Sequence, residues 1–186
     1  YMKRAAELAL FMSEAAGTKT SLSDGITPEK IRDSLYFAIM SDDPTISQAI
    51  FNEFNKLKEK EDLKDKIEGI INAKDEFGQS LFLLAACNGK TEIVNILLSQ
   101  PGIKINTTDN KGMTPLHYAV KNGYTKVVQL LLSHPDINLN IKTNGDPEKT
   151  PLEIAIEEGN KDIVQLLLLQ PGIDISTIKE DDIEKK

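Results

Sequence analysis

The sequence predicts an all-α solenoid, a row of short helix pairs in which each pair covers its neighbours. Three observations predict it. Part of the chain repeats itself at intervals of 34 and 36 residues, each copy has the spacing of two short helices, and the second helix of each copy is apolar on nearly every side. A helix pair of this kind cannot bury its own leucines, so neighbouring pairs must cover one another.

The repeat is seen best in the stretch TPLHYAVKNGYTKVVQLLLSHPDINLN, residues 114–140. At an offset of 34 positions the chain reads SLFLLAACNGKTEIVNILLSQPGIKIN, and at an offset of 36 positions it reads TPLEIAIEEGNKDIVQLLLLQPGIDIS. The two additional residues of the longer interval fall in the connection IKTNGDPEKT, where an insertion costs little. Three copies in register indicate a repeat protein.

The middle copy predicts two helices with defined ends. Thr114 is expected to cap the first helix, with Pro115 at its first position. Gly123 is expected to end that helix in the left-handed conformation that glycine adopts at little cost. We expect Thr125 to cap the second helix and Pro135 to prevent its continuation. The inward-facing residues of the first helix are Leu116, Ala119 and Val120.

A fourth, degenerate copy lies upstream. In DSLYFAIMSDDPTISQAIF, residues 33–51, the apolar positions stay in register with the later copies, but Asp42 replaces the glycine. The charged stretch KLKEKEDLKDKIEG lengthens this unit, and its mixed signs at helical spacing indicate a solvated helix face. Before this copy, residues 3–16 are typical of an amphipathic helix, and the pair Thr27-Pro28 marks another helix start.

These patterns divide the chain into four parts. We expect residues 1–32 to form a helical cap, because the end of a solenoid otherwise exposes the face that a neighbour would cover. Residues 33–74 are the degenerate repeat with an extended charged helix, and residues 75–177 are the three full repeats. Residues 178–186 are a charged tail. Leu169 stands where the other copies have serine, so we expect either this tail to fold over the last repeat or further repeats to follow.

Composition and charge restrict the classes of function. The 186 residues carry a net charge of -7, which argues against a general nucleic-acid binder, since such a protein needs a basic face for phosphate. The single cysteine, Cys87, excludes an internal disulfide and suits a reducing compartment, so a cytoplasmic location is expected. The apolar runs are far shorter than the roughly 20 residues that span a bilayer. The chain starts at Tyr1 instead of methionine, so we expect a piece of a longer protein.

The segment GMTPLHYAVKNGYTKVVQLLLS resembles the ankyrin repeat, because the T-P-L-H-x-A opening, the mid-unit glycine and the V-V-x-L-L-L second helix are all present. The resemblance is close over residues 75–175 and weaker over residues 33–72. It implies stacked helix pairs with hairpin-like connections, a role in protein–protein interaction, no enzymatic activity and no cofactor. The other two full copies depart from the motif, since Leu83 and Glu153 replace His117.

The residues that could carry chemistry have better structural interpretations. The resemblance implies that His117 ties the turn of its repeat to the neighbouring repeat by hydrogen bonds. His117, the distant His134 and Cys87 do not make a zinc ligand set, so no metal is expected. Cys87 has no activating histidine in its own repeat. Glu157 and Glu158 are adjacent on a helix and point in different directions, which does not suit acid–base catalysis. The sequence therefore predicts no catalytic site.

By the same resemblance, the partner-binding surface is the concave face made by the hairpin tips and the first helices. We expect Phe77, Met113 and Tyr118 to be exposed apolar anchors of an interface. For Leu84 and Ile154, covering the core is an equally good interpretation. The expected contact residues are Glu76, Phe77, Gln79, Leu84 and Asn88 in the first full repeat, Asn110, Lys111, Met113, Tyr118, Lys121 and Asn122 in the second, and Glu148, Lys149, Ile154, Glu157 and Glu158 in the third.

The sequence thus predicts a monomeric, non-catalytic module that binds another protein, with no nucleic-acid or membrane partner. The alternative is a structural spacer or an intramolecular clamp within a larger multidomain protein. Richness in Ile, Lys and Asn suggests an AT-rich genome. Since ankyrin proteins are common in bacteria that live inside eukaryotic cells, analogy adds a secreted effector that acts in the host cytoplasm.

Overall fold

The computed structural model describes residues 27–41, 44–57 and 61–178, and all regular structure in them is helical. This confirms the predicted all-α class. The chain divides into two compact units, of which one runs to Ala73 and includes Ser99–Ile103, and the other comprises Lys74–Leu98 and everything from Lys104. The cap predicted for residues 1–32 lies almost wholly outside the described residues, as does the predicted tail. No helix in the described part of the chain is long and apolar enough to cross a membrane.

The first unit contains α2 (Pro28–Met40), α3 (Pro44–Leu57) and α4 (Glu61–Asn72), and α2 packs against both of the others. The start of α2 is the predicted one, since the Thr27 hydroxyl accepts the Lys30 N–H at 3.3 Å. In the charged stretch, α4 buries Ile67 and exposes its neighbours Lys66 and Glu68, as expected for a helix with a solvated face.

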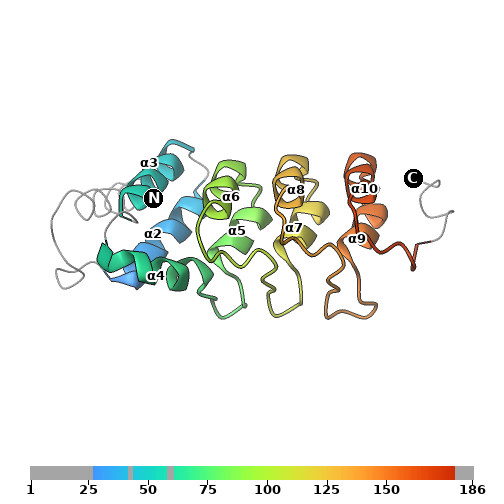
Figure 1. Ribbon diagram of the computed structural model, residues 1–186, viewed down its shortest axis with the longest axis horizontal. Helices are drawn as coiled ribbons and strands as arrows, with labels where there is room; N and C mark the ends of the chain where they lie inside the picture. Colours follow the sequence, from blue (N-terminus) through green and yellow to red (C-terminus); the bar gives the residue numbers. More distant parts are fainter. Residues whose placement is uncertain (1–26, 42–43, 58–60, 179–186) are drawn as a thin grey trace. The chain divides into compact units, whose positions relative to one another are not determined.

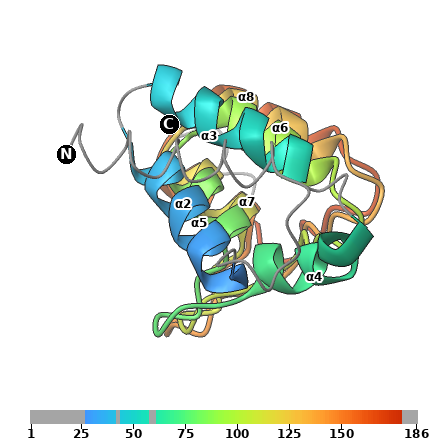
Figure 2. The same ribbon diagram turned by 90° about the vertical axis from the view of Figure 1, so that its left-hand side faces the viewer.

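The second unit consists of three helix pairs that lie side by side (Figure 1). The pairs are α5 (Leu81–Cys87) with α6 (Thr91–Leu98), α7 (Pro115–Lys121) with α8 (Thr125–Leu132), and α9 (Pro151–Glu157) with α10 (Lys161–Leu168). Each first helix packs against the next first helix, and each second helix against the next second helix. Viewed along the row, α5 and α7 lie in one layer and α6 and α8 in another (Figure 2). The hairpins between pairs all project on the same side (Figure 1).

The core of the second unit lies between these two layers. In the middle repeat, the predicted stripe of α7 is buried, and α8 buries three of its apolar residues completely while Leu130 and Leu132 remain partly exposed. Each fully buried aliphatic side chain stabilises the fold by roughly 1.5–3 kcal/mol before conformational entropy is subtracted. The fully buried residues of α8 are Val127, Val128 and Leu131.

The turn between α7 and α8 confirms one prediction and corrects another. Gly123 has a φ of 70°, the left-handed conformation expected at this helix end. The prediction that Thr125 caps α8 is wrong, because Tyr124 occupies the cap position and makes no side-chain cap bond. The Thr125 N–H donates to the Gly123 carbonyl oxygen at 2.9 Å, so the tight glycine turn places Thr125 already inside the helix.

Asparagine side chains after the second helices join one repeat to the next. The Asn106 side-chain amide donates to the Asp136 carbonyl oxygen at 2.7 Å and accepts the Asn138 N–H at 2.9 Å. Asn140 makes the equivalent two bonds one repeat later, at 2.8 and 2.9 Å. An amide suits this position because it carries a donor and an acceptor on the same group. The connections of successive repeats are therefore held in a fixed relation.

Candidate functional site

The hairpin between α6 and α7 is organised by a buried carboxylate. One oxygen of Asp109 accepts the N–H groups of Lys111 and Met113, both at 2.9 Å, and Gly112 closes the turn with a φ of 73°. Asp75 makes the same pair of bonds in the hairpin before α5. A carboxylate that accepts two backbone N–H groups fixes the shape of the tip, so these two hairpins are closely alike.

Backbone hydrogen bonds link the hairpin tips of neighbouring repeats. The backbone N–H of Asn110 donates to the Phe77 carbonyl oxygen at 3.1 Å, and the backbone N–H of Asn144 donates to the Lys111 carbonyl oxygen at 2.9 Å. A Cβ atom added at Gly112 would lie 2.6 Å from the Asn144 side-chain oxygen and 2.7 Å from its backbone nitrogen. The close approach of the second and third hairpins therefore requires glycine at this position.

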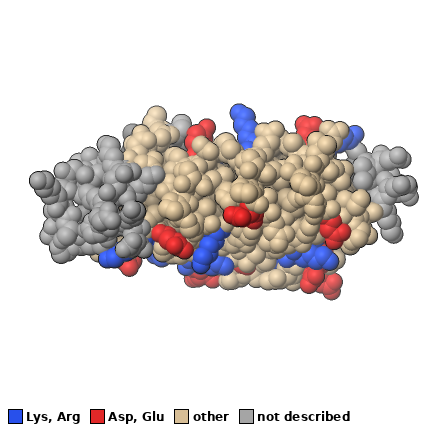
Figure 3. Space-filling model, in the orientation of Figure 1, with Lys and Arg blue, Asp and Glu red and all other residues tan. Residues whose placement is uncertain are grey.

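The third hairpin, residues 143–149, is longer than the other two. Thr143 replaces the organising aspartate, donating its N–H to the Lys149 carbonyl oxygen (3.0 Å) and accepting the Lys149 N–H on its hydroxyl (3.1 Å). The inserted residues enlarge the tip, which includes a cis peptide bond between Asp146 and Pro147. On the face seen in Figure 3, charged side chains of both signs gather along the edge of the second unit where the hairpins project.

A groove of about 670 Å³ lies between the second and third repeats, with the tip of the long hairpin forming one of its walls. We call the surface made by the hairpin tips and the exposed side of α5, α7 and α9 the hairpin face. The groove brings together nine of the residues predicted to contact a partner, namely Asn110, Lys111, Met113, Tyr118, Lys121, Lys149, Ile154, Glu157 and Glu158. The predicted contact residues of the first repeat, with Asn122 and Glu148, lie outside it.

The wall of this groove was not predicted from the sequence. Thr143, Asn144, Gly145, Asp146 and Pro147 line it, and none of them was among the predicted contact residues. The signal that could have identified them is the two-residue insertion that lengthens the interval from 34 to 36 residues. An insertion at a hairpin tip adds surface without disturbing the helices behind it.

The expected apolar anchors differ in exposure. Phe77 is 61% exposed, as predicted, but Met113 is only 8% exposed, so the prediction that it is exposed is wrong. Tyr118 is half-buried, and its hydroxyl donates to the second carboxylate oxygen of Asp109 at 2.7 Å. Burial and this bond to Asp109 raise the pKa of Tyr118. Met113 and Tyr118 therefore support the second hairpin as well as lining the groove.

Leu84 and Ile154 are also mainly core residues. They are 7% and 6% exposed, and they occupy equivalent positions in the first helices α5 and α9. This burial favours the interpretation that they cover the core, although Ile154 also contributes to the lining of the groove.

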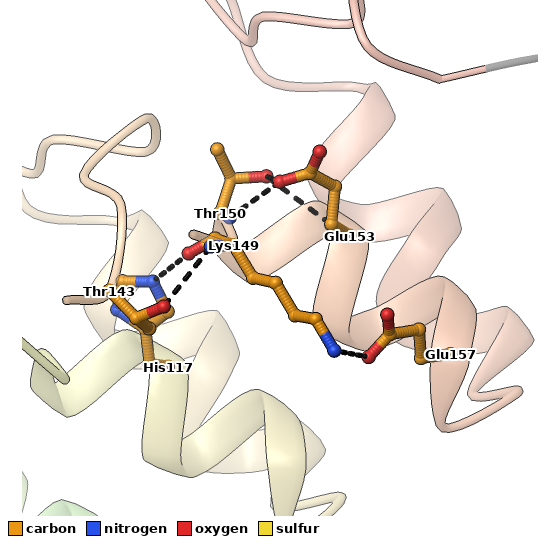
Figure 4. Close-up of polar contacts among 6 residues, drawn as sticks. All are labelled: His117, Thr143, Lys149, Thr150, Glu153 and Glu157. Carbon is orange, nitrogen blue, oxygen red and sulfur yellow. Dashed lines mark hydrogen bonds and ion pairs between the residues drawn. The ribbon is translucent and has the colours of Figure 1, made fainter. Parts of the chain in front are cut away.

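His117 is completely buried and has a hydrogen-bond partner at each ring nitrogen; Figure 4 shows the contact with the Lys149 carbonyl oxygen. Nδ1 accepts the Thr114 N–H at 3.1 Å and lies 2.7 Å from the Thr114 hydroxyl. Nε2 lies 3.1 Å from the Lys149 carbonyl oxygen, in the hairpin of the next repeat. The neutral ring protonated at Nε2 satisfies both sides. Burial lowers the pKa of His117, against an opposing contribution from the Lys149 carbonyl. The predicted structural role is confirmed.

Glu153 replaces this histidine in the third repeat (Figure 4). Its Oε2 accepts the Thr150 N–H at 2.7 Å, and its Oε1 accepts the Thr177 hydroxyl at 2.7 Å. Burial alone would raise the pKa of Glu153, but the hydrogen bonds from Thr150 and Thr177 lower it overall. Nearby, the Lys149 ammonium forms an ion pair with Glu157 at 2.7 Å.

Cys87 lies at the end of α5, and its carbonyl oxygen accepts the Asn122 side-chain amide at 2.9 Å. Burial raises the pKa of the Cys87 thiol, Asp109 adds to the effect, and Lys121 opposes it. A thiol with a raised pKa is mostly protonated at neutral pH and is a poor nucleophile. Within the described ranges, no group of three or more His, Cys, Asp and Glu side chains is arranged to hold a metal ion.

Two-layered helix pairs joined by hydrogen-bonded hairpins define a helical repeat protein of the solenoid class. A family model described as ankyrin repeats in three copies matches residues 35–143 and 82–179. The chain belongs to the ankyrin-repeat family. No curated protein matches it. Ankyrin repeats are generally protein–protein interaction modules and are typically non-enzymatic.

Proposed function

We propose that the second unit is a non-catalytic binding module that holds a partner protein on the hairpin face. The observation that carries this proposal is the groove between the second and third repeats. Its lining combines Met113, Tyr118 and Ile154 with charged side chains of both signs. An apolar centre surrounded by polar groups is the usual composition of a protein interface.

The internal bonds of the hairpin face support the same proposal. The three tips are tied to one another through Asn110 and Asn144, and His117 ties α7 to the third hairpin. A surface fixed before binding loses little conformational entropy when a partner docks. Recognition would therefore depend on complementary shape and charge, with no cofactor, and the partner would meet it in the cytoplasm.

Site-specific photocrosslinking tests this proposal. A photoreactive amino acid would replace Lys111 or Glu158 on the hairpin face, and Gln129 or Gln165 on the second helices as matched controls. All four residues are exposed. In a cell extract, we expect protein adducts from the first two positions and few from the controls. Adducts from the control positions alone would contradict the proposal.

The same experiment separates the alternative roles. Adducts formed only with other segments of the same polypeptide would favour an intramolecular clamp, and no adducts at any position would favour a spacer. Adducts with eukaryotic proteins in a host extract, absent from a bacterial extract, would favour the secreted effector.

A further inference from the structure

Equivalent positions on the hairpin face carry different charges in the three full repeats. At the end of the first helix the residues are Cys87, Lys121 and Glu157, and in the hairpins Phe77 is matched by Lys111. At these two positions the first repeat therefore presents uncharged groups, although Asp75 and Glu76 are exposed in its hairpin. The second presents two lysines, and the third presents a glutamate pair. The face changes from apolar to basic to acidic along the row of repeats.

Among the described residues, the basic band (Lys111 and Lys121) has no ion-pair partner, and the acidic band (Glu157 and Glu158) is only partly neutralised. Lys149 pairs with Glu157 inside the third repeat. Over the part of the chain that the structure describes, Lys111, Lys121 and Glu158 form no ion pair. All three are exposed and line the groove. Charges in a hollow with low-dielectric walls act on a ligand more strongly than charges on an open surface.

The distance between repeats sets the spacing between the side chains of a ligand that contacts these bands. Packed helices lie about 8–10 Å apart, and an extended segment in the polyproline II conformation advances about 3.1 Å per residue with three residues per turn, so every third side chain lies on the same side. An extended segment that crosses the face from one repeat to the next therefore presents about one side chain in three to each band.

We propose that the hairpin face selects an extended segment of a partner protein, with an apolar, an acidic and a basic side chain at successive intervals of about three residues. The acidic side chain faces Lys111 and Lys121, and the basic side chain faces Glu158. This proposal rests on the proposed function, because it assigns the partner chemistry of the same surface. The Asn144 bond to the second hairpin holds the enlarged tip as a fixed wall beside the two charged bands.

The test is selection of random peptides of about twelve residues, displayed on phage, against three immobilised chains. They are the wild type, the double variant Lys121→Glu with Glu158→Lys, and the control variant Lys126→Glu with Asp162→Lys on the second helices. Lys126 and Asp162 are exposed, so the control changes equal charges away from the hairpin face. Circular dichroism verifies that each chain is folded.

We expect the wild type and the control to enrich the order apolar, acidic, basic, in either chain direction, with the stated spacing. The double variant should enrich acidic and basic residues in exchanged positions. Peptides selected by the wild type should bind the double variant about tenfold more weakly, since opposed charges are replaced by like charges. Absence of a charge order, or an order that the double variant leaves unchanged, would overturn the proposal.

Crosslinking of the selected peptides separates this failure from failure of the proposed function. If the selected peptides show no charge order but crosslink at Lys111 or Glu158, the proposed function stands and only the proposed order of apolar, acidic and basic side chains is rejected. If the peptides crosslink only at Gln129 or Gln165, both the proposed function and the proposed charge order are rejected. If no peptide is enriched and the chain dimerises in sedimentation experiments, with the dimer lost in the double variant, a second copy is the occupant and the proposal is overturned.

Discussion

The turns that begin α7 and α9 form the same kind of helix cap with different side chains. His117 and Glu153 are equivalent residues, and each accepts the backbone N–H of the threonine that caps its own helix. They differ in the second contact, because His117 reaches forward to the Lys149 carbonyl oxygen, whereas Glu153 accepts the Thr177 hydroxyl. In the first repeat Leu83 occupies the position, and the Ser80 hydroxyl alone caps α5.

This difference separates a local requirement from a tertiary one. Any acceptor at the third position of the helix can complete the cap, so a histidine and a glutamate are both suitable. Only a donor can satisfy the carbonyl oxygen of the following hairpin, and the second ring nitrogen of His117 supplies it. The middle repeat is therefore the one in which the helix cap and the junction between repeats depend on the same side chain.

The largest expected effect is that of His117→Ala. The substitution leaves a buried cavity, removes the side-chain partner of the Thr114 N–H and removes one of the two donors to the Lys149 carbonyl oxygen, so we expect a loss of about 3 kcal/mol of unfolding free energy. Urea unfolding followed by circular dichroism measures it. A loss below about 1 kcal/mol would show that the junction does not depend on this histidine.

Hydrogen exchange should locate the effect of the same substitution. The Thr143 N–H donates to the Lys149 carbonyl oxygen, which His117 also contacts. In His117→Ala we therefore expect the Thr143 amide to exchange about tenfold faster, relative to amides in the interior of α9, than it does in the wild type. In Glu153→Ala the same amide should exchange as in the wild type. Equal acceleration in both variants would indicate general loosening of the fold instead of a broken junction.

A smaller effect is expected for Glu153→Ala. Glu153 is half-buried and Thr177 is exposed, so water can replace the lost partners of Thr150 and Thr177. We expect a loss of about 1 kcal/mol in urea unfolding, as is usual for a helix cap. A loss equal to that of His117→Ala would remove the distinction between the two turns.

The smallest expected difference is in how the contributions of His117 and Glu153 to the unfolding free energy depend on pH. The pKa of His117 is lowered from 6.5 by burial, so as the pH falls the unfolded chain takes up this proton before the folded chain does. The contribution of His117 is complete above pH 6.5 and is lost as the pH falls below it. The pKa of Glu153 is lowered from 4.5, so its contribution persists until the pH falls below that value.

Unfolding free energies measured between about pH 7.5 and about pH 5 should therefore decline in the wild type and in Glu153→Gln. The decline should be reduced in His117→Gln, which lacks the titrating ring. An unchanged pH dependence in His117→Gln would assign the decline to another group.

Local backbone rules were predictable from the sequence. The pairs Thr27-Pro28 and Thr114-Pro115 predicted helix starts, and Gly123 predicted a left-handed helix end, because each acts through its own dihedral angles or its immediate neighbours. The role of His117 came from the resemblance of its motif. Such features need no knowledge of the distant chain.

Exposure and the shape of the groove could not be predicted in the same way. Asp109, which organises the second hairpin, accepts both the Met113 N–H and the Tyr118 hydroxyl. These bonds hold Met113 and Tyr118 against the hairpin, so neither side chain is fully exposed. The wall at residues 143–147 depends on where an inserted tip comes to lie against its neighbour. Both are properties of packed hairpins, and a pattern of residue types does not specify them.

The bonds from Asn106, Asn122 and Asn140 to the neighbouring repeat each join groups that are 30 to 35 residues apart in sequence. Each of these bonds can therefore form as soon as the neighbouring repeat has been synthesised. As each new helix pair leaves the ribosome, the pair made just before it can already receive its bonds, so assembly can keep pace with translation.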